Sequence, residues 1–143
     1  MLKKLLVPMD GSEIALRALA LAMQIGRKFD SEIIVLTVDI PYDRTVMFKA
    51  DKQHSPDKVI AVEINNPLDL AEQYANKEGY KNIIFQDIID LDPAGCIIAE
   101  AEKAKTDMII MGNRGMGVLT GLLMGSVSTK VVKAAPCPVV IVK

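Results

Sequence analysis

Five glycines occur in the fifteen residues from Gly112 to Ser126, and Arg114 is the only formally charged residue among them. This stretch directly follows the apolar run at 107–111. Glycine within structured backbone costs roughly 0.5–1 kcal/mol relative to alanine, so this density indicates backbone that bends sharply or approaches another group closely. The sequence therefore predicts a loop that lies against a ligand.

Two familiar phosphate-binding motifs do not fit this loop. Gly115, Gly117 and Gly121 approach the dinucleotide fingerprint GxGxxG, but one residue too many separates the last two glycines. The acidic residue expected about twenty positions further on is missing, because no Asp or Glu follows Asp107. No GK[ST] occurs either, and the nearest lysine, Lys130, belongs to the next helical pattern. The loop is therefore expected to be neither an NAD-binding loop nor a P-loop.

Five apolar runs rich in β-branched residues alternate with helical patterns along the chain. Most runs are apolar at consecutive positions, as expected for a parallel sheet that helices cover on both faces. We predict an α/β fold with a five-stranded, doubly wound, Rossmann-like parallel sheet. The expected strands are 3–9, 32–40, 82–89, 107–111 and 137–143, and the expected helices are 12–29, 67–79, 92–106 and 126–135. The segment 41–64 has no clean period, apart from a helical pattern at 58–63.

Ligands of doubly wound sheets bind beyond the carboxyl ends of the strands, where the strand order reverses. Two predicted loops lie there: the one that holds Asp10, after the first strand, and the glycine-rich loop after the fourth. Asp10 has two interpretations, because it either contacts the ligand or caps the next helix with Glu13 completing a capping box. Ser12 is an alternative cap for that helix.

The composition excludes several classes of protein. The 143 residues suit one domain spanning 1–143, with an aliphatic core because the chain has three Phe, three Tyr and no Trp. Seventeen Lys and Arg balance eighteen Asp and Glu, so no basic field favours nucleic acid or an anionic membrane. No long apolar run and no secretory signal pattern occur, so we expect a cytoplasmic protein.

The cysteines and the histidine form no recognisable metal or catalytic pattern. Cys96 and Cys137 are isolated, without CxxC spacing, and His54 is far from both in the sequence. We expect no disulfide and no metal held by side chains of the protein. Cys137, between two prolines, is expected to be a small buried hydrophobic residue.

A different choice of glycines gives a more specific pattern: Gly112, two residues, Gly115, nine residues, then Gly125 followed by Ser126. Together with the early VPMDGS, the ending APCPVVIVK and the order of elements, this pattern resembles the universal stress protein family over nearly the whole chain. In the nucleotide-binding branch of that family, the motif cradles the phosphates and ribose of ATP, in a fold like that of the adenine nucleotide alpha hydrolases. The resemblance therefore implies ATP as the ligand.

The resemblance also implies which residues contact the nucleotide. Pro8, Val38 and Met111 would lie around the adenine, although Val38 also suits ordinary core packing. Ser126 and Ser128 would donate hydroxyl hydrogen bonds to phosphate, cap the last helix, or do both. The full implied set is Pro8, Asp10, Val38, Met111, Gly112, Arg114, Gly115, Gly125, Ser126, Val127 and Ser128.

A triphosphate carries more negative charge than these loops offset. A helix N-terminus contributes typically 0.3–1 kcal/mol per charge, and Arg114 is the only cation of the glycine loop. We therefore expect Mg²⁺, held mainly through phosphate oxygens and water. Because the loops offer no carboxylate, histidine or lysine beyond Asp10 and Arg114, we expect no catalytic residue and at most a slow ATPase. The preferred function is a nucleotide-dependent regulatory or stress-response module.

An alternative function is a dimeric scaffold that binds no nucleotide. The final run at 137–143 would be an apolar edge strand, which is an aggregation hazard unless it is paired or covered. Relatives in the family commonly pair through this strand, so the resemblance implies a homodimer through 137–143. A dimer suits both functions, and the sequence specifies neither the stress nor the protein partner.

Overall fold

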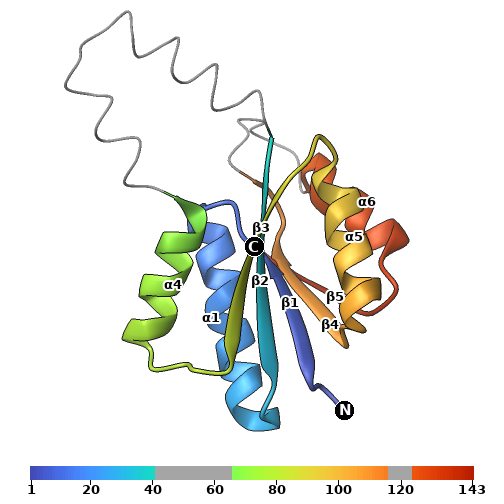
Figure 1. The fold of residues 1–143 in the computed structure, drawn as a ribbon. Coiled ribbons are helices and arrows are strands. Elements are labelled where there is room, and N and C mark those ends of the chain that lie inside the picture. The colour runs from blue at the N-terminus through green and yellow to red at the C-terminus, as the bar shows by residue number, and fades with distance from the viewer. Residues whose placement is uncertain (41–65, 116–123) are drawn as a thin grey trace, which may run out of the picture.

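The computed structural model describes residues 1–40, 66–115 and 124–143 (Figure 1). They form a five-stranded sheet with the order β3-β2-β1-β4-β5, in which every neighbouring pair of strands is parallel. The strands are β1 (Lys4–Pro8), β2 (Glu32–Asp39), β3 (Ile83–Ile89), β4 (Met108–Gly112) and β5 (Val139–Val142). The helices are α1 (Glu13–Phe29), α4 (Pro67–Lys77), α5 (Pro93–Ala104) and α6 (Ser126–Ala134). The predicted doubly wound α/β fold is confirmed.

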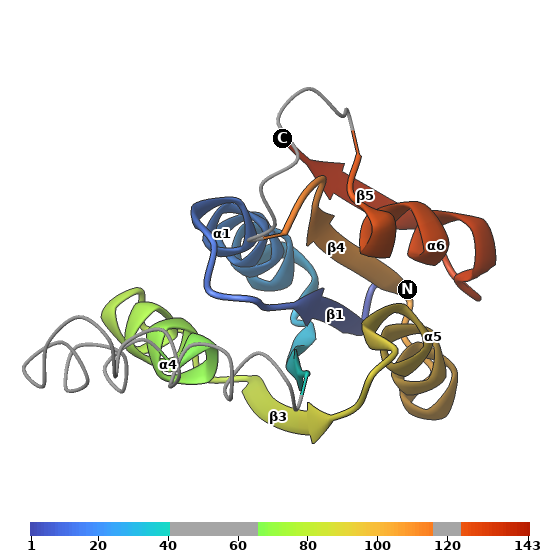
Figure 2. The same cartoon turned by 90° about the horizontal axis from the view of Figure 1, so that it is seen from above.

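Helices cover both faces of the sheet, with α1 and α4 on one face and α5 and α6 on the other (Figure 2). Successive residues of a strand point to opposite faces, so each face has its own core. Leu5 and Val7 belong to the core under α1 and α4, whereas Leu6 belongs to the core under α5 and α6. All three are fully buried, which explains why the strand sequence is apolar without alternation.

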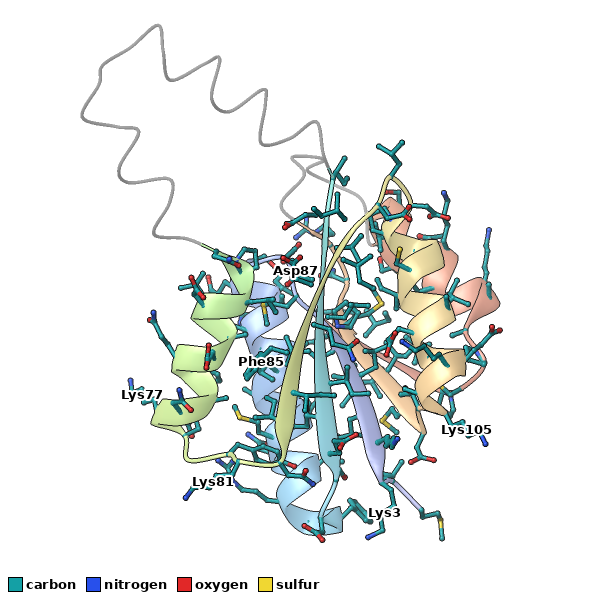
Figure 3. All side chains as sticks on the ribbon, in the orientation of Figure 1. Lys3, Lys77, Lys81, Phe85, Asp87 and Lys105 are labelled. Atoms are coloured by element: carbon teal, nitrogen blue, oxygen red, sulfur yellow. The ribbon has the colours of Figure 1, made fainter. Side chains whose placement is uncertain are left out.

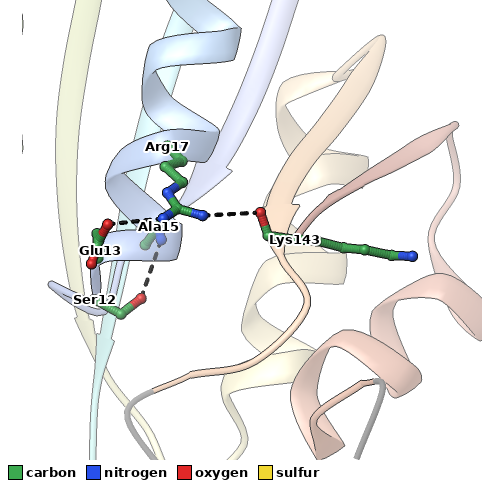
Figure 4. Close-up of polar contacts among 5 residues, drawn as sticks. All are labelled: Ser12, Glu13, Ala15, Arg17 and Lys143. Atoms are coloured by element: carbon green, nitrogen blue, oxygen red, sulfur yellow. Dashed lines mark hydrogen bonds and ion pairs between the residues drawn. The ribbon is translucent and has the colours of Figure 1, made fainter.

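The helices begin at the capping residues that the sequence offers. The side chains of Ser12, Asn66 and Asp92 accept hydrogen bonds from backbone N–H groups in the first turns of α1, α4 and α5, at 3.2, 3.0 and 3.1 Å. These bonds satisfy N–H groups that have no partner within the helix. Ser12 therefore caps α1, which settles the choice that the sequence left between Ser12 and Asp10 (Figure 4).

The elements differ from the sequence prediction mainly at their ends. β5 begins at Val139 rather than at Cys137, because Pro136 and Pro138 have no N–H to donate to a ladder. The helical pattern at 58–63, like His54, Gly117 and Gly121, lies outside the described residues. Within the described ranges, no helix is both long enough and apolar enough to cross a membrane.

Candidate nucleotide-binding site

The carboxyl ends of β1 and β4 bring the two predicted loops together. A Cβ built on Gly115 would lie only 2.9 Å from Oδ2 of Asp10, which is closer than real Cβ atoms come to other heavy atoms. Glycine therefore allows the backbone of the glycine loop to approach the carboxylate of the first loop. Two segments that are far apart in the sequence meet at this point.

The N-terminus of α6 forms the third side of this arrangement. The N–H of Gly125 donates to the carbonyl of Asn113 at 2.7 Å, and a Cβ on Gly125 would lie 3.5 Å from Cα of Arg114. Gly125 is the N-cap of α6 and supplies no capping side chain. The first turn of α6 therefore directs backbone N–H groups and the positive end of its dipole toward the loop, an arrangement that suits an anion.

Asp10 is held in place by its own turn. Its Oδ1 accepts the N–H of Ser12 at 2.9 Å, while Gly11 between them adopts a φ of 83°, which other residues rarely adopt. The buried hydroxyl of Thr37 donates to the carbonyl of Met9 at 2.9 Å and fastens the first loop to β2. The carboxylate of Asp10 is therefore positioned before any ligand binds, and sequence reasoning assigned no part of this to Thr37.

Asn113 is a residue that sequence reasoning missed. Its N–H donates to the carbonyl of Val142 at 2.8 Å, and its carbonyl accepts both the N–H of Gly125 and the hydroxyl of Ser128. The backbone of Asn113 thereby joins β5 and α6 to the end of β4. Backbone contacts of this kind do not depend on the side chain, so the sequence carries no signal for them.

The two serines of α6 have different environments. Ser126 is exposed at the first position of the helix. Ser128 is only 2% exposed, and its hydroxyl donates to the carbonyls of Asn113 and Gly125 at 2.8 and 3.1 Å. Neither side chain caps the helix, because Gly125 is the N-cap. Ser126 is thus accessible to a phosphate, whereas the proton of Ser128 already joins α6 to the glycine loop.

The apolar residues of the predicted set lie on the α5–α6 side of the sheet. Met111 belongs to that core with 5% of its surface exposed, and Val38 and Val127 pack against it while remaining partly exposed. Pro8 ends β1 opposite Leu36 of β2. Val38 therefore packs against the core, as its alternative interpretation held. Part of its side chain stays exposed near the carboxyl end of β2, where a base would lie.

The packing of the fold requires a glycine at position 112, and this requirement does not involve a ligand. A Cβ on Gly112 would lie 2.5 Å from Cγ2 of Ile14, on the first turn of α1. The end of β4 must therefore lack a side chain for α1 to pack against it. Arg114, two residues later, is exposed.

The thiols of the described residues offer no reactive nucleophile. Burial is the main cause that raises the pKa of Cys96, and the carboxylates of Asp90 and Asp92 raise it further. Burial also raises the pKa of Cys137. Both thiols therefore stay protonated at neutral pH. Among the described residues, no group of three or more His, Cys, Asp or Glu is arranged to hold a metal ion.

The fold and the meeting of these loops define an α/β protein whose candidate ligand site lies beyond the carboxyl ends of β1 and β4. Residues 1–143 match the model of the universal stress protein family. The chain is also 33% identical over 142 residues to "Universal stress protein MJ0531" of Methanocaldococcus jannaschii, across 99% of this chain and 82% of that protein. This chain belongs to the universal stress protein family.

Solved structures share the fold over nearly their whole length. The structure of the hypothetical protein MJ0577 has a TM-score of 0.75 and 26% identity, covering 100% of this chain and 96% of that one. A universal stress protein in complex with cAMP has a TM-score of 0.69 and 24% identity, covering 98% and 95%. The universal stress protein from Archaeoglobus fulgidus in complex with dAMP has a TM-score of 0.68 and 20% identity, covering 100% of both chains. At these identities, the last two comparisons support the fold.

Proposed function

We propose that this chain is an ATP-binding universal stress protein that acts as a nucleotide-dependent regulatory or stress-response module in the cytoplasm, with little or no hydrolysis. The observation that carries the proposal is the convergence of Asp10, Gly115 and the N-terminus of α6 beyond the carboxyl ends of the strands. Family members of the same fold have been solved with cAMP and with dAMP, and this supports an adenine nucleotide as the ligand.

The described residues suit the parts of a nucleotide. The N–H groups at the start of α6 and the hydroxyl of Ser126 would donate to phosphate oxygens. The carboxylate of Asp10 only accepts hydrogen bonds when it is ionised, so it would bind a hydroxyl or amino group of the nucleoside rather than a phosphate. Val38, which stays partly exposed, would give the base an apolar surface, and Met111, which is only 5% exposed, would contribute less.

Mg²⁺ is part of the proposal because the described residues of the candidate site carry little positive charge. Arg114 is the only cation in the described parts of the two loops. When bound, Mg²⁺ supplies positive charge to the phosphates, and it prefers phosphate oxygens and water as ligands. The protein's own contribution would then be the backbone donors of α6 and the guanidinium of Arg114.

Slow or absent hydrolysis follows from the same residues. Phosphoryl transfer to water needs a group that positions the water and charges that stabilise the transition state. Asp10 is the only carboxylate in the described parts of the two loops, and its Oδ1 already accepts the N–H of Ser12. Nucleotide binding, rather than turnover, is therefore the activity that these residues support.

A pair of matched substitutions tests this proposal. Asp10→Asn removes a carboxylate at the candidate site, whereas Asp107→Asn makes the same change at the opposite, amino-terminal ends of the strands. We expect adenine nucleotide in the supernatant of denatured wild-type and Asp107→Asn protein, but much less from Asp10→Asn protein, with all three folded by circular dichroism.

If the purified proteins carry no nucleotide, thermal unfolding with added ATP replaces the analysis of the supernatant. ATP with Mg²⁺ at about a hundred times the dissociation constant should stabilise wild type and Asp107→Asn by ~2.7 kcal/mol. The absence of any shift at millimolar ATP would contradict the proposal and favour the scaffold function.

A further inference from the structure

Among the residues that the structure describes, β3 is the edge strand at the end of the sheet opposite β5 (Figure 2). The N–H of Ile33 donates to the carbonyl of Asn82, and the N–H of Asp90 donates to the carbonyl of Asp39. Because bonding alternates along a parallel ladder, the even-numbered residues of β3 bond to β2. The odd-numbered residues 83, 85, 87 and 89 therefore direct their N–H and C=O groups away from β2, as a template for another strand.

This edge is unusually apolar. The strand reads IIFQDII, with Asp87 as its only charge. Ile84 is 41% exposed and Ile89 is 66% exposed, and the two side chains point to opposite faces of the sheet. α4 packs over β2 and β3 on one face, whereas α5 on the other face packs over β1 and β2. Exposed edge strands usually carry charges or are covered, so β3 presents a surface that association would bury.

The sequence of β3 is nearly symmetric about Gln86, and this symmetry indicates what covers it. We infer that β3 pairs antiparallel with β3 of a second copy, about a two-fold axis at Gln86. This register places Ile83 opposite Ile89 of the second copy and Ile84 opposite Ile88, so each exposed isoleucine meets another isoleucine. The inference concerns the far end of the sheet and does not depend on nucleotide binding.

The charges at the two ends of β3 support the same register. Lys81 lies just before the strand and Asp90 just after it, and Figure 3 shows Lys81 and Asp87 toward opposite ends of β3. Antiparallel pairing about Gln86 brings Lys81 of each copy to the turn that holds Asp90 of the other. An axis at Asp87 would instead place two carboxylates directly opposite each other, which is unfavourable.

The helices of the described residues leave room for this pairing. α4 packs over both β2 and β3, so it lies slightly inside the edge of the sheet. With strands about 4.8 Å apart, two α4 helices related by the axis would lie roughly 10 Å apart, which is an ordinary helix-packing distance. A continuous sheet through β3 is therefore sterically reasonable and adds a contact between helices.

A disulfide experiment tests the register directly. In this pairing, Gln86 of one copy lies opposite Gln86 of the other in a non-hydrogen-bonded pair. The two Cα atoms are about 4.5 Å apart, which is within the range of a disulfide. Gln86→Cys should form a covalent dimer on mild oxidation, seen on a non-reducing denaturing gel. Ile84→Cys is the matched control, because the Cα atoms of residue 84 in the two copies would lie about 14 Å apart. Wild type, with Cys96 and Cys137, reports the background.

Sedimentation equilibrium tests the interface without a cross-link. Ile89→Lys should raise the dissociation constant of the β3-mediated association at least tenfold, whereas Val132→Lys, on an exposed position of α6, should leave it unchanged. Asp87→Asn should strengthen association, because the two Asp87 carboxylates lie diagonally across the axis. Equal cross-linking of Gln86→Cys and Ile84→Cys, or an unchanged association of Ile89→Lys, would overturn the inference.

Discussion

At the scale of single residues, Asp107 shows how one carboxylate fastens two strands. Its Oδ2 accepts the backbone N–H groups of Lys4 and Lys3, at 2.9 and 2.8 Å, where β1 and β4 begin. The bonds from Lys4 and Lys3 hold the pKa of Asp107 below its ordinary value, and they outweigh a small opposing effect of burial. The ionised form of Asp107 therefore stabilises the folded state.

Asp107→Asn tests this contribution, because asparagine keeps an acceptor oxygen but loses the charge. We expect a loss of about 1 kcal/mol in the free energy of unfolding at pH 7, since the carboxylate is partly exposed. A lowered pKa in the folded state means that the contribution is present above the unfolded pKa, about 4, and is lost as the pH falls further. Urea unfolding should show the two proteins converging below that pH, and a constant difference would contradict the account.

At the scale of elements, the start of α6 depends on a bond that crosses from one element to another. The hydroxyl of Ser128 donates to the carbonyl of Asn113 at 2.8 Å, and so holds the helix against the end of β4. Ser126, one helical position beyond the N-cap, is exposed. Within this single turn, Ser128 therefore stabilises the fold, whereas Ser126 is placed to contact a ligand.

Substituting each serine by alanine should separate these roles. Ser128→Ala removes a buried hydrogen bond and should cost about 1 kcal/mol of unfolding free energy. Ser126→Ala should change stability by less than ~0.5 kcal/mol, as exposed substitutions usually do, but should weaken nucleotide binding severalfold. Chemical denaturation and a nucleotide titration of both variants give the comparison. Equal stability losses for the two would show that the bond of Ser128 contributes little.

The elements also show what the sequence can predict. The consecutive apolar residues of β1 predicted a strand buried on both faces, and the helical patterns at 67–79 and 92–106 predicted α4 and α5, because these signals are local. The meeting of Asp10 and Gly115 followed from a rule about where loops gather on such sheets. The roles of Asn113 and Thr37 were not predictable, because each depends on a backbone carbonyl brought near by the tertiary fold.

At the scale of the whole molecule, the two edge strands of the sheet, β5 and β3, offer two separate surfaces for association. Every residue of β5 is partly exposed, and Nη1 of Arg17 donates to the carbonyl of Lys143 at 3.3 Å while Nη2 pairs with Glu13 (Figure 4). These contacts join the end of the chain to α1. We propose that copies pair through 137–143, at the opposite end of the sheet from β3, so the two interfaces use different strands and do not overlap.

A proline substitution tests pairing through β5. The even-numbered residues of β5 bond to β4, so the N–H of Ile141 points to the open edge. Ile141→Pro removes this donor, and we expect it to abolish pairing through β5. Ile141→Ala loses the same packing but keeps the N–H, and should still pair. Sedimentation should show a monomer only when Ile141→Pro is combined with Ile89→Lys, and unaffected pairing in Ile141→Pro would contradict the assignment.

The most direct test of nucleotide binding is a calorimetric titration of ATP into nucleotide-free protein, with and without Mg²⁺. We expect saturable binding at one site per chain that strengthens with Mg²⁺. Gly115→Ala should bind at least tenfold more weakly while unfolding at a similar temperature, because its Cβ would displace the carboxylate of Asp10. Folded wild-type protein that releases no heat at millimolar ATP, or Gly115→Ala protein that binds as well as wild type, would contradict the proposed site.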